Sequence, residues 1–357
     1  MKKLLLSLLI LSCVLGMQSC SEDFEVAAPY RPITVVYGML NIKDTAHYIR
    51  IQKSFLDENK NAIDMAKVSD SSFYKPGDID VLIKEFNNGT LVGQPIVLQR
   101  VNMADENYPK NSGVFFTDPS YAYKFTNPLV RSHTYRLLIN NKVTGINDSA
   151  EINIVDSSYL LARSVNYDPH VTYTINFAAP GSSVTPNKFQ VFIEPAPSGA
   201  PGAIQYMEGI LRFHWVDSNL STGAQRDTMA DFFFDSAEGS DLILQVENAS
   251  FYTFFRQVMK EAPEGHVRLI DTGEMIVYGS GKEFSDYAKT IQLQNAGFTA
   301  DQIKPFYTNI KGKDVFGLFT SRTFRVKENV VVSDVTMDSL KNSVLAKGLG
   351  IRGRSHH

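Results

Sequence analysis

The sequence predicts a mainly β protein, in which an N-terminal Ig-like β-sandwich is followed by a β-rich α+β domain with two or three short amphipathic helices. Many short segments alternate apolar and polar residues with a period of two, as half-buried strands do. Turn residues separate these segments at intervals of roughly ten residues, which is typical of a sandwich. Two later segments instead have the period of an amphipathic helix.

Length and composition exclude several classes of protein. A chain of 357 residues is long enough for about two domains. Hydrophobic residues make up 43% and charged residues 20%, as in an ordinary globular protein. The net charge is −3 and no long basic run occurs, so we expect no nucleic-acid partner.

Residues 1–20 have the organisation of a lipoprotein signal peptide. Lys2 and Lys3 precede an apolar run, Leu4–Leu15, that is too short to span a bilayer, which takes roughly 20 residues. The run ends in small residues just before Cys20. We expect cleavage before Cys20 and a diacylglycerol on its sulfur. The only other cysteine, Cys13, lies in the leader, so the mature chain has no thiol for a disulfide or a metal site.

An acidic segment follows the cysteine. Ser21, Glu22, Asp23, Phe24 and Glu25 resemble the signal that sends Bacteroidota lipoproteins to the outer face of the outer membrane. The alternative is an ordinary acidic tether after a cleaved leader. In either case residues 21–31 are predicted to be an extended tether, because Pro29 and Pro32 favour an extended backbone.

The first predicted domain covers residues 32–156. Ile33–Tyr37 is rich in β-branched and aromatic residues, and His47–Lys53 alternates apolar and polar residues. Ile79–Phe86 alternates in the same way and ends at Asn87-Asn88-Gly89, a hairpin signal. Between them Asn59–Tyr74 is predicted to be a loop with a helical turn at Ala62–Lys67. Further strands are expected at Pro95–Gln99, Val114–Phe116, Tyr121–Phe125, Thr134–Ile139 and Glu151–Val155.

The second predicted domain covers residues 157–345, and residues 346–357 are predicted to be a flexible tail. Two helices are expected, at Ala249–Lys260 and Glu283–Asn295, because each places apolar residues at i, i+3, i+4 and i+7. The strands are expected at Ser157–Leu161, Tyr173–Phe177, Phe189–Ile193, Gly209–Val216, Met229–Phe234, Met275–Tyr278, Val315–Phe319 and Val330–Val332.

The exported cysteine, the acidic tether and the stretches ITVVYGMLN, HYIRIQKSFLD and TYRLLINNKVTG together resemble a family of Bacteroidota outer-membrane lipoproteins, classed as a domain of unknown function. FYTNIKGKDVFGLFTSR is similar to the glycine-rich ending of that family: Asn309, Ile310, Gly312, Gly317 and Phe319 match, while Lys313-Asp314-Val315 departs from it. Members are commonly encoded beside TonB-dependent transporters. The resemblance implies an accessory role at a transporter, and it carries over no catalytic residue.

The chain has no recognisable catalytic or metal-binding motif. Tyr278–Lys282 lacks the spacing of a Gly-x-Ser-x-Gly elbow, and no His-Glu-x-x-His occurs. We therefore expect neither an enzyme nor a cofactor. Sugar binding often uses exposed aromatic faces, which Tyr121, Tyr123 and Tyr167 could supply; a role in the core is favoured for them.

Bacteroidota also attach O-glycans to Asp-Ser or Asp-Thr followed by a small or aliphatic residue. Composition alone predicts about one such triplet, but several occur, so glycans at some of them are a reasonable hypothesis. The alternative is that Asp-Ser and Asp-Thr pairs mark turns. The candidate acceptors are Thr45, Ser149, Thr228, Ser236 and Ser339.

These observations predict a lipid-anchored protein of the outer membrane, facing the cell exterior. Its expected partners are the membrane, through the lipid on Cys20, and a TonB-dependent barrel that it serves by capturing substrate or covering the pore. The alternative is a structural subunit of a complex for outer-membrane protein assembly, secretion or gliding.

Overall fold

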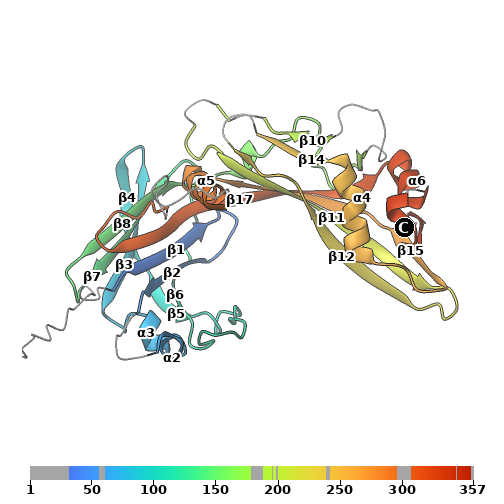
Figure 1. The fold of residues 1–357 in the computed structure, drawn as a ribbon. Coiled ribbons are helices and arrows are strands. Elements are labelled where there is room, and N and C mark those ends of the chain that lie inside the picture. Colours follow the sequence, from blue (N-terminus) through green and yellow to red (C-terminus); the bar gives the residue numbers. More distant parts are fainter. Residues whose placement is uncertain are drawn as a thin grey trace, which may run out of the picture.

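The computed structural model describes residues 32–55, 61–177, 188–194, 196–197, 200–238, 242–295, 307–342 and 344–354. Within them one long strand, β17 (Val315–Val332), runs through two units, each with its own hydrophobic core (Figure 1). The predicted fold class is confirmed: the chain is mainly β, with a β-sandwich followed by a β-rich α+β unit.

Two sheets enclose the first core. One contains β17 and four further strands: the first of these pairs in parallel with β17, and the remaining pairs are antiparallel. The other sheet is wholly antiparallel. Apolar side chains alternate inward from both sheets, so that Val36, Ile49, Ile83 and Leu137 are each fully buried. The first sheet has the order β17, β1 (Thr34–Leu40), β2 (His47–Lys53), β6 (Tyr121–Phe125) and β5 (Gln99–Asn102), and the second β4 (Thr90–Val97), β3 (Ile79–Asn87), β7 (Thr134–Asn141) and β8 (Asn147–Asn153).

Local sequence explains the connections in this unit. β3 and β4 are joined by Asn88 and Gly89, which have φ of 48° and 80°, the left-handed conformation that a tight hairpin requires. The predicted helical turn is α2 (Ala62–Ala66), followed by α3 (Ser69–Ser72). The side chain of Asn61 caps α2 by accepting a hydrogen bond from the Ile63 backbone N–H.

The first half of β17 joins the sandwich through Asn309, Gly317 and Phe319. It pairs in parallel with β1, so that Val36 lies opposite Gly317. A Cβ on Gly317 would lie 1.9 Å from the Val36 carbonyl oxygen, and the residue has φ of +133°. The Asn309 side chain donates to the Phe319 carbonyl at 2.6 Å and accepts from the Phe319 N–H at 2.9 Å. These residues therefore fasten the strand to the first core.

The sheet that contains β17 continues into the second unit from the other half of this strand. Its order here is β17, β16 (Gly273–Ser280), β11 (Tyr206–Asn219), β15 (His266–Ile270) and β18 (Ile351–Arg354). Two further strands, β12 (Gln225–Phe233) and β13 (Ala237–Glu238), also pair with β11, and β9 (Tyr173–Ile175) pairs with β17. β10 (Lys188–Phe192) and β14 (Ile243–Glu247) form a separate antiparallel pair. Both bury residues in the second core, where they cover one face of the larger sheet.

Helix α4 (Asn248–Met259) packs on the same face of this sheet (Figure 1). Its predicted apolar stripe is buried: Phe251 stacks on Phe177 at 4.0 Å, and Phe255 lies 5.3 Å from Phe213. Helix α5 (Lys282–Asn295) lies beside β17 and packs Phe284 against Tyr206 at 5.0 Å. The remaining helical elements are η1 (Ser157–Tyr159), α6 (Asp334–Asn342) and η2 (Val344–Ala346).

Several predicted elements differ from the observed ones. Val114–Phe116 forms a loop, and Ser157–Leu161 begins with the turn η1, because the Asp156 side chain caps it by accepting from the Ser158 N–H. The strands predicted at Val315–Phe319 and Val330–Val332 are parts of the single strand β17. Sequence patterns did not reveal β14, β15, α6 or β18.

The prediction of a flexible tail over 346–357 is wrong for residues 346–354. Leu349 is buried, and β18 pairs in parallel with β15. The predicted boundary between 156 and 157 falls between Ile154 of the first core and Leu160 of the second. However, Ile310, Val315 and Phe319 return to the first core, so residues 32–156 supply only part of that core.

Candidate functional site

The predicted membrane-targeting residues lie outside the described residues. They are the leader 1–20, the tether 21–31, Cys20 as the lipid acceptor and the export residues Ser21–Glu25. Within the described ranges, no helix combines the length and apolar character that a membrane crossing requires.

The candidate O-glycosylation residues fall into two groups. Thr45, in the turn after β1, and Ser236, between β12 and β13, are exposed. Ser149, Thr228 and Ser339 are partly buried, and the Ser339 hydroxyl donates to the Val335 carbonyl at 2.9 Å. Thr45 and Ser236 are therefore the more accessible of the five candidate acceptors.

The histidines do not form a metal site. The described part of the chain contains no group of three or more His, Cys, Asp or Glu side chains arranged to hold an ion. His47 is buried against the Phe125 ring at 4.7 Å, and this burial lowers its pKa. It is a core residue of β2.

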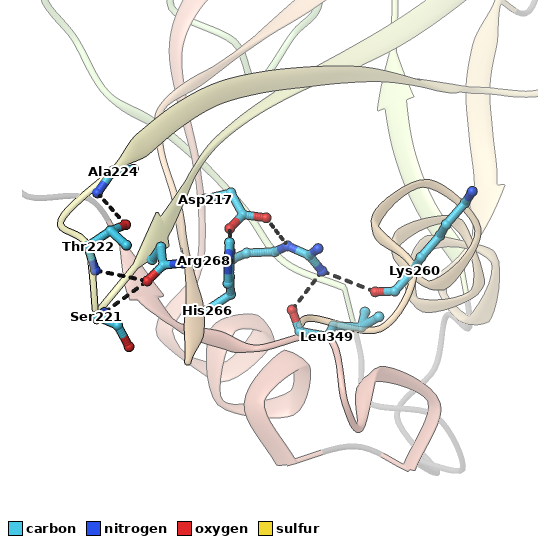
Figure 2. A network of polar contacts seen from close by, with 9 residues as sticks. Asp217, Ser221, Thr222, Ala224, Lys260, His266, Arg268 and Leu349 are labelled. Atoms are coloured by element: carbon cyan, nitrogen blue, oxygen red, sulfur yellow. Dashed lines mark hydrogen bonds and ion pairs between the residues drawn. The ribbon is translucent and has the colours of Figure 1, made fainter. Parts of the chain in front are cut away.

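Asp217, His266 and Arg268 form the polar network that most resembles a catalytic arrangement (Figure 2). His266 Nδ1 lies 2.7 Å from Asp217 Oδ1, and Arg268 Nε donates to Asp217 Oδ2 at 3.0 Å. Burial raises the pKa of Asp217, but the hydrogen bonds from His266 and Arg268 outweigh it, and the net shift is downward. Because Asp217 and Arg268 are direct partners across β11 and β15, the sheet register itself creates the pair.

The rest of this network occupies the groups that catalysis would need. With Nδ1–H donating to Asp217, His266 Nε2 is an acceptor, and it lies 3.1 Å from the Asn219 side-chain amide. The lone pair that a general base would use is thus taken. Arg268 Nη1 donates to the carbonyls of Leu349 at 2.9 Å and Lys260 at 3.1 Å. The network therefore ties α4 and the C-terminal segment to the sheet.

A different cluster, on the outer face of the sandwich, is accessible to a ligand. On β2 the side chains of Tyr48 and Arg50 alternate with the core residues Ile49 and Ile51, so they point away from the core. The loop 103–120 lies over them: Tyr108 contacts the Tyr48 ring at 5.7 Å, and Arg50 Nη2 donates to Ser120 Oγ at 2.6 Å. This loop also carries Lys110, close enough for the Arg50 charge to lower the Lys110 pKa. We call Tyr37, Arg50, Lys110, Phe115 and Ser120 the outer-face cluster.

Aromatic residues fix the position of Lys110. Its Nζ lies 4.9 Å from the centre of the Phe116 ring and 5.3 Å from that of Phe115, and it donates to the Phe116 carbonyl at 3.0 Å. Phe116 in turn packs edge-on against buried Phe73 at 5.6 Å, and its N–H donates to the Ala66 carbonyl. Phe115 is left 53% exposed at the surface.

Sequence reasoning missed this cluster and named other aromatic residues. Tyr123 is in the core, Tyr121 lies under the Arg100 guanidinium at 3.3 Å, and Tyr167 lies under that of Arg325 at 4.3 Å. Tyr123 therefore has the favoured core role, whereas Tyr121 and Tyr167 are only partly buried. Arg50 and Lys110 are far apart in sequence, and no local pattern joins them.

A separate polar group lies where the loop before β17 meets the sandwich. Asp148 is 2% exposed, and its Oδ1 has no hydrogen-bond partner among the described residues. Burial raises its pKa to about 6; a hydrogen bond from the Lys313 N–H opposes this rise, and the charge of Asp314 adds to it. A Cβ on Gly312 would lie 1.9 Å from Asp148 Oδ1, so only glycine fits there.

Asp148→Asn is expected to stabilise the protein at pH 8 by about 2 kcal/mol and to have little effect at pH 4. A raised native pKa favours folding at low pH, and this contribution is lost as the pH rises from 3.8, the ordinary value, through about 6. Urea unfolding across this pH range measures the difference. Asp105→Asn, on an exposed loop, is the control and keeps the wild-type pH dependence; a D148N profile parallel to wild type would contradict the prediction.

Comparison with known proteins adds no further assignment. No protein-family model matches the chain, and no curated protein matches its sequence.

Proposed function

We propose that the chain is a lipid-anchored outer-membrane protein, exposed on the cell surface, that acts by binding and without bond chemistry as an accessory subunit of a TonB-dependent transporter. The observation that carries the proposal is the sequence around Cys20: a short apolar leader, small residues before the cysteine and the acidic Ser21–Glu25 after it. The resemblance to a lipoprotein family encoded beside such transporters supports the choice of partner.

The architecture is compatible with this role. The tether ends where β1 begins, so the lipid is linked to the sandwich. An anchor of this kind holds the molecule in the plane of its partner and raises the effective concentration of one for the other. The outer-face cluster lies on this same unit and offers two exposed rings and two partly buried cations to a substrate.

Cys20→Ala is expected to move most of the protein from the membrane fraction to the soluble fraction of its native host, because one thioether carries the lipid. Cys13→Ala is the matched control: it removes the other cysteine, from inside the leader, and should leave attachment unchanged. Fractionation followed by immunoblotting measures both. A C20A protein that stays fully membrane-associated would overturn the anchor.

Surface exposure and the partner need separate measurements. Protease added to intact cells should degrade the wild type, whereas replacing Glu22, Asp23 and Glu25 by their amides should leave the protein attached but protected. Affinity purification from detergent extracts identifies the partner. A TonB-dependent barrel supports the proposal; an assembly, secretion or gliding complex supports the alternative, and purification of the chain without any barrel contradicts both.

A further inference from the structure

The outer-face cluster holds two cations that have hydrogen-bonding capacity to spare. Arg50 Nη2 donates to Ser120 Oγ at 2.6 Å, and Lys110 Nζ donates to the Phe116 carbonyl at 3.0 Å. A guanidinium and an ammonium each carry more N–H donors than these bonds use. Ser120 is itself buried, and its N–H is bonded to Asn102 Oδ1, so the Arg50 contact is held by the fold.

Two described carboxylates of the loop 103–120 are engaged with other residues. Glu106 Oε2 accepts from Lys124 at 2.5 Å and from the Tyr48 hydroxyl at 2.7 Å. Asp118 Oδ1 accepts from the Asn102 amide at 2.8 Å. Among the described residues, no carboxylate lies within ion-pair distance of Arg50 or Lys110.

The two cations also destabilise each other. Burial lowers the pKa of Arg50, and burial together with the nearby Arg50 charge lowers the pKa of Lys110. An anion between two such groups would offset both the desolvation and the repulsion. The site thus favours a ligand with a negative charge.

Exposed rings flank the cations. Tyr37 is the direct cross-strand partner of Arg50, points to the same outer face and is 52% exposed. Phe115, beside Lys110, is 53% exposed. An exposed aromatic face packs well against the apolar C–H face of a sugar ring, because it supplies flat apolar area at little entropic cost.

We propose that the outer-face cluster binds an acidic glycan, with the carboxylate or sulfate of one sugar between Arg50 and Lys110 and a sugar ring against Tyr37 or Phe115. This inference deepens the proposed function, because it names the class of substrate that the surface protein would capture. The charge selects acidic sugars over neutral ones, and the rings select a sugar over a free inorganic anion.

Calorimetric titration of the purified full-length lipoprotein in detergent tests this ligand class. The probes are oligogalacturonate, a sulfated oligosaccharide of similar length and a neutral oligogalactoside. We expect at least one acidic probe to bind about tenfold or more tightly than the neutral one, and binding to weaken with added salt. Whichever acidic probe binds shows whether carboxylate or sulfate is preferred. Equal binding of acidic and neutral probes, or binding of neither acidic probe, overturns the inference.

Variants then locate the site. Lys110→Gln and Tyr37→Ala are each expected to weaken binding of the acidic probe about tenfold, and Arg50→Gln at least as much. Lys142→Gln removes a surface lysine paired with Asp80 on the opposite sheet and should bind as the wild type does. Because Arg50 is partly buried, its variant is checked by urea unfolding; Lys110 lies on a loop and keeps the test valid if R50Q misfolds. Wild-type binding by K110Q and Y37A contradicts the proposed site.

The barrel purification distinguishes this inference from the proposed function. K110Q should still purify with the transporter, since the cluster contacts the glycan. If the barrel is recovered and no acidic glycan binds, only the ligand class is wrong.

Discussion

Gly317→Val is expected to destabilise the protein by about 4 kcal/mol or more, a large part of the 5–15 kcal/mol that typically separates folded from unfolded chains. The new Cβ would overlap the Val36 carbonyl oxygen, and valine disfavours a φ of +133°. Since Gly317 pairs with β1 in the strand that both units share, we expect both cores to be affected.

Urea unfolding followed by two probes measures this. Trp215 is the only tryptophan and is buried in the second core, so its fluorescence reports on that core. Hydrogen exchange of β1 and β2 reports on the first. Gly113→Val, at a loop position with open space and no positive φ, should change stability by less than about 0.5 kcal/mol. A G317V protein with the wild-type midpoint in both probes would mean that β17 does not pair with β1 as described.

Arg268→Leu is expected to cost about 3 kcal/mol and to release the C-terminal segment. The Arg268 side chain is 7% exposed, and its loss leaves Asp217 with His266 as its remaining partner. The carbonyls of Lys260 and Leu349 lose their donor as well. The effect therefore combines a partly buried carboxylate that has lost one of its two partners with two backbone carbonyls that have lost their donor.

Exchange rates locate this effect. Amides of β18 should exchange faster in R268L, and the urea midpoint should fall. Arg163→Leu removes an exposed arginine outside the strands and outside this network, and it should stay within about 0.5 kcal/mol of the wild type. If R268L protects β18 as well as the wild type does, the network in Figure 2 is not what holds the C-terminal segment.

Most strands and the long helices could be predicted from sequence because their burial follows a simple period. His47–Lys53 alternates between core and surface, and the Phe stripe of α4 faces its own core. β17 could not be predicted as one strand because buried polar residues interrupt its pattern. Thr320, Thr323 and Lys327 are fully buried, and Lys327 Nζ donates to the carbonyls of Asp168 and Val171 at 2.5 Å each.

The candidate site was beyond sequence reasoning for a related physical reason. Arg50 and Lys110 meet only because the loop 103–120 folds back over β2, and that path depends on Phe116 packing against Phe73. β18 was missed in the same way, since its glycine- and arginine-containing sequence has no strand period and is held by tertiary contacts to Arg268.

Because β17 comes late in the sequence, it limits the order in which the two units can fold. During synthesis residues 32–154 are made first, yet the edge of β1 stays open until residues 315–321 are available to pair with it. Until then a long row of backbone donors and acceptors is available to any other extended chain. The half-built sandwich must therefore be protected from pairing with other chains until β17 is made, and a chain truncated before β17 would expose that edge permanently.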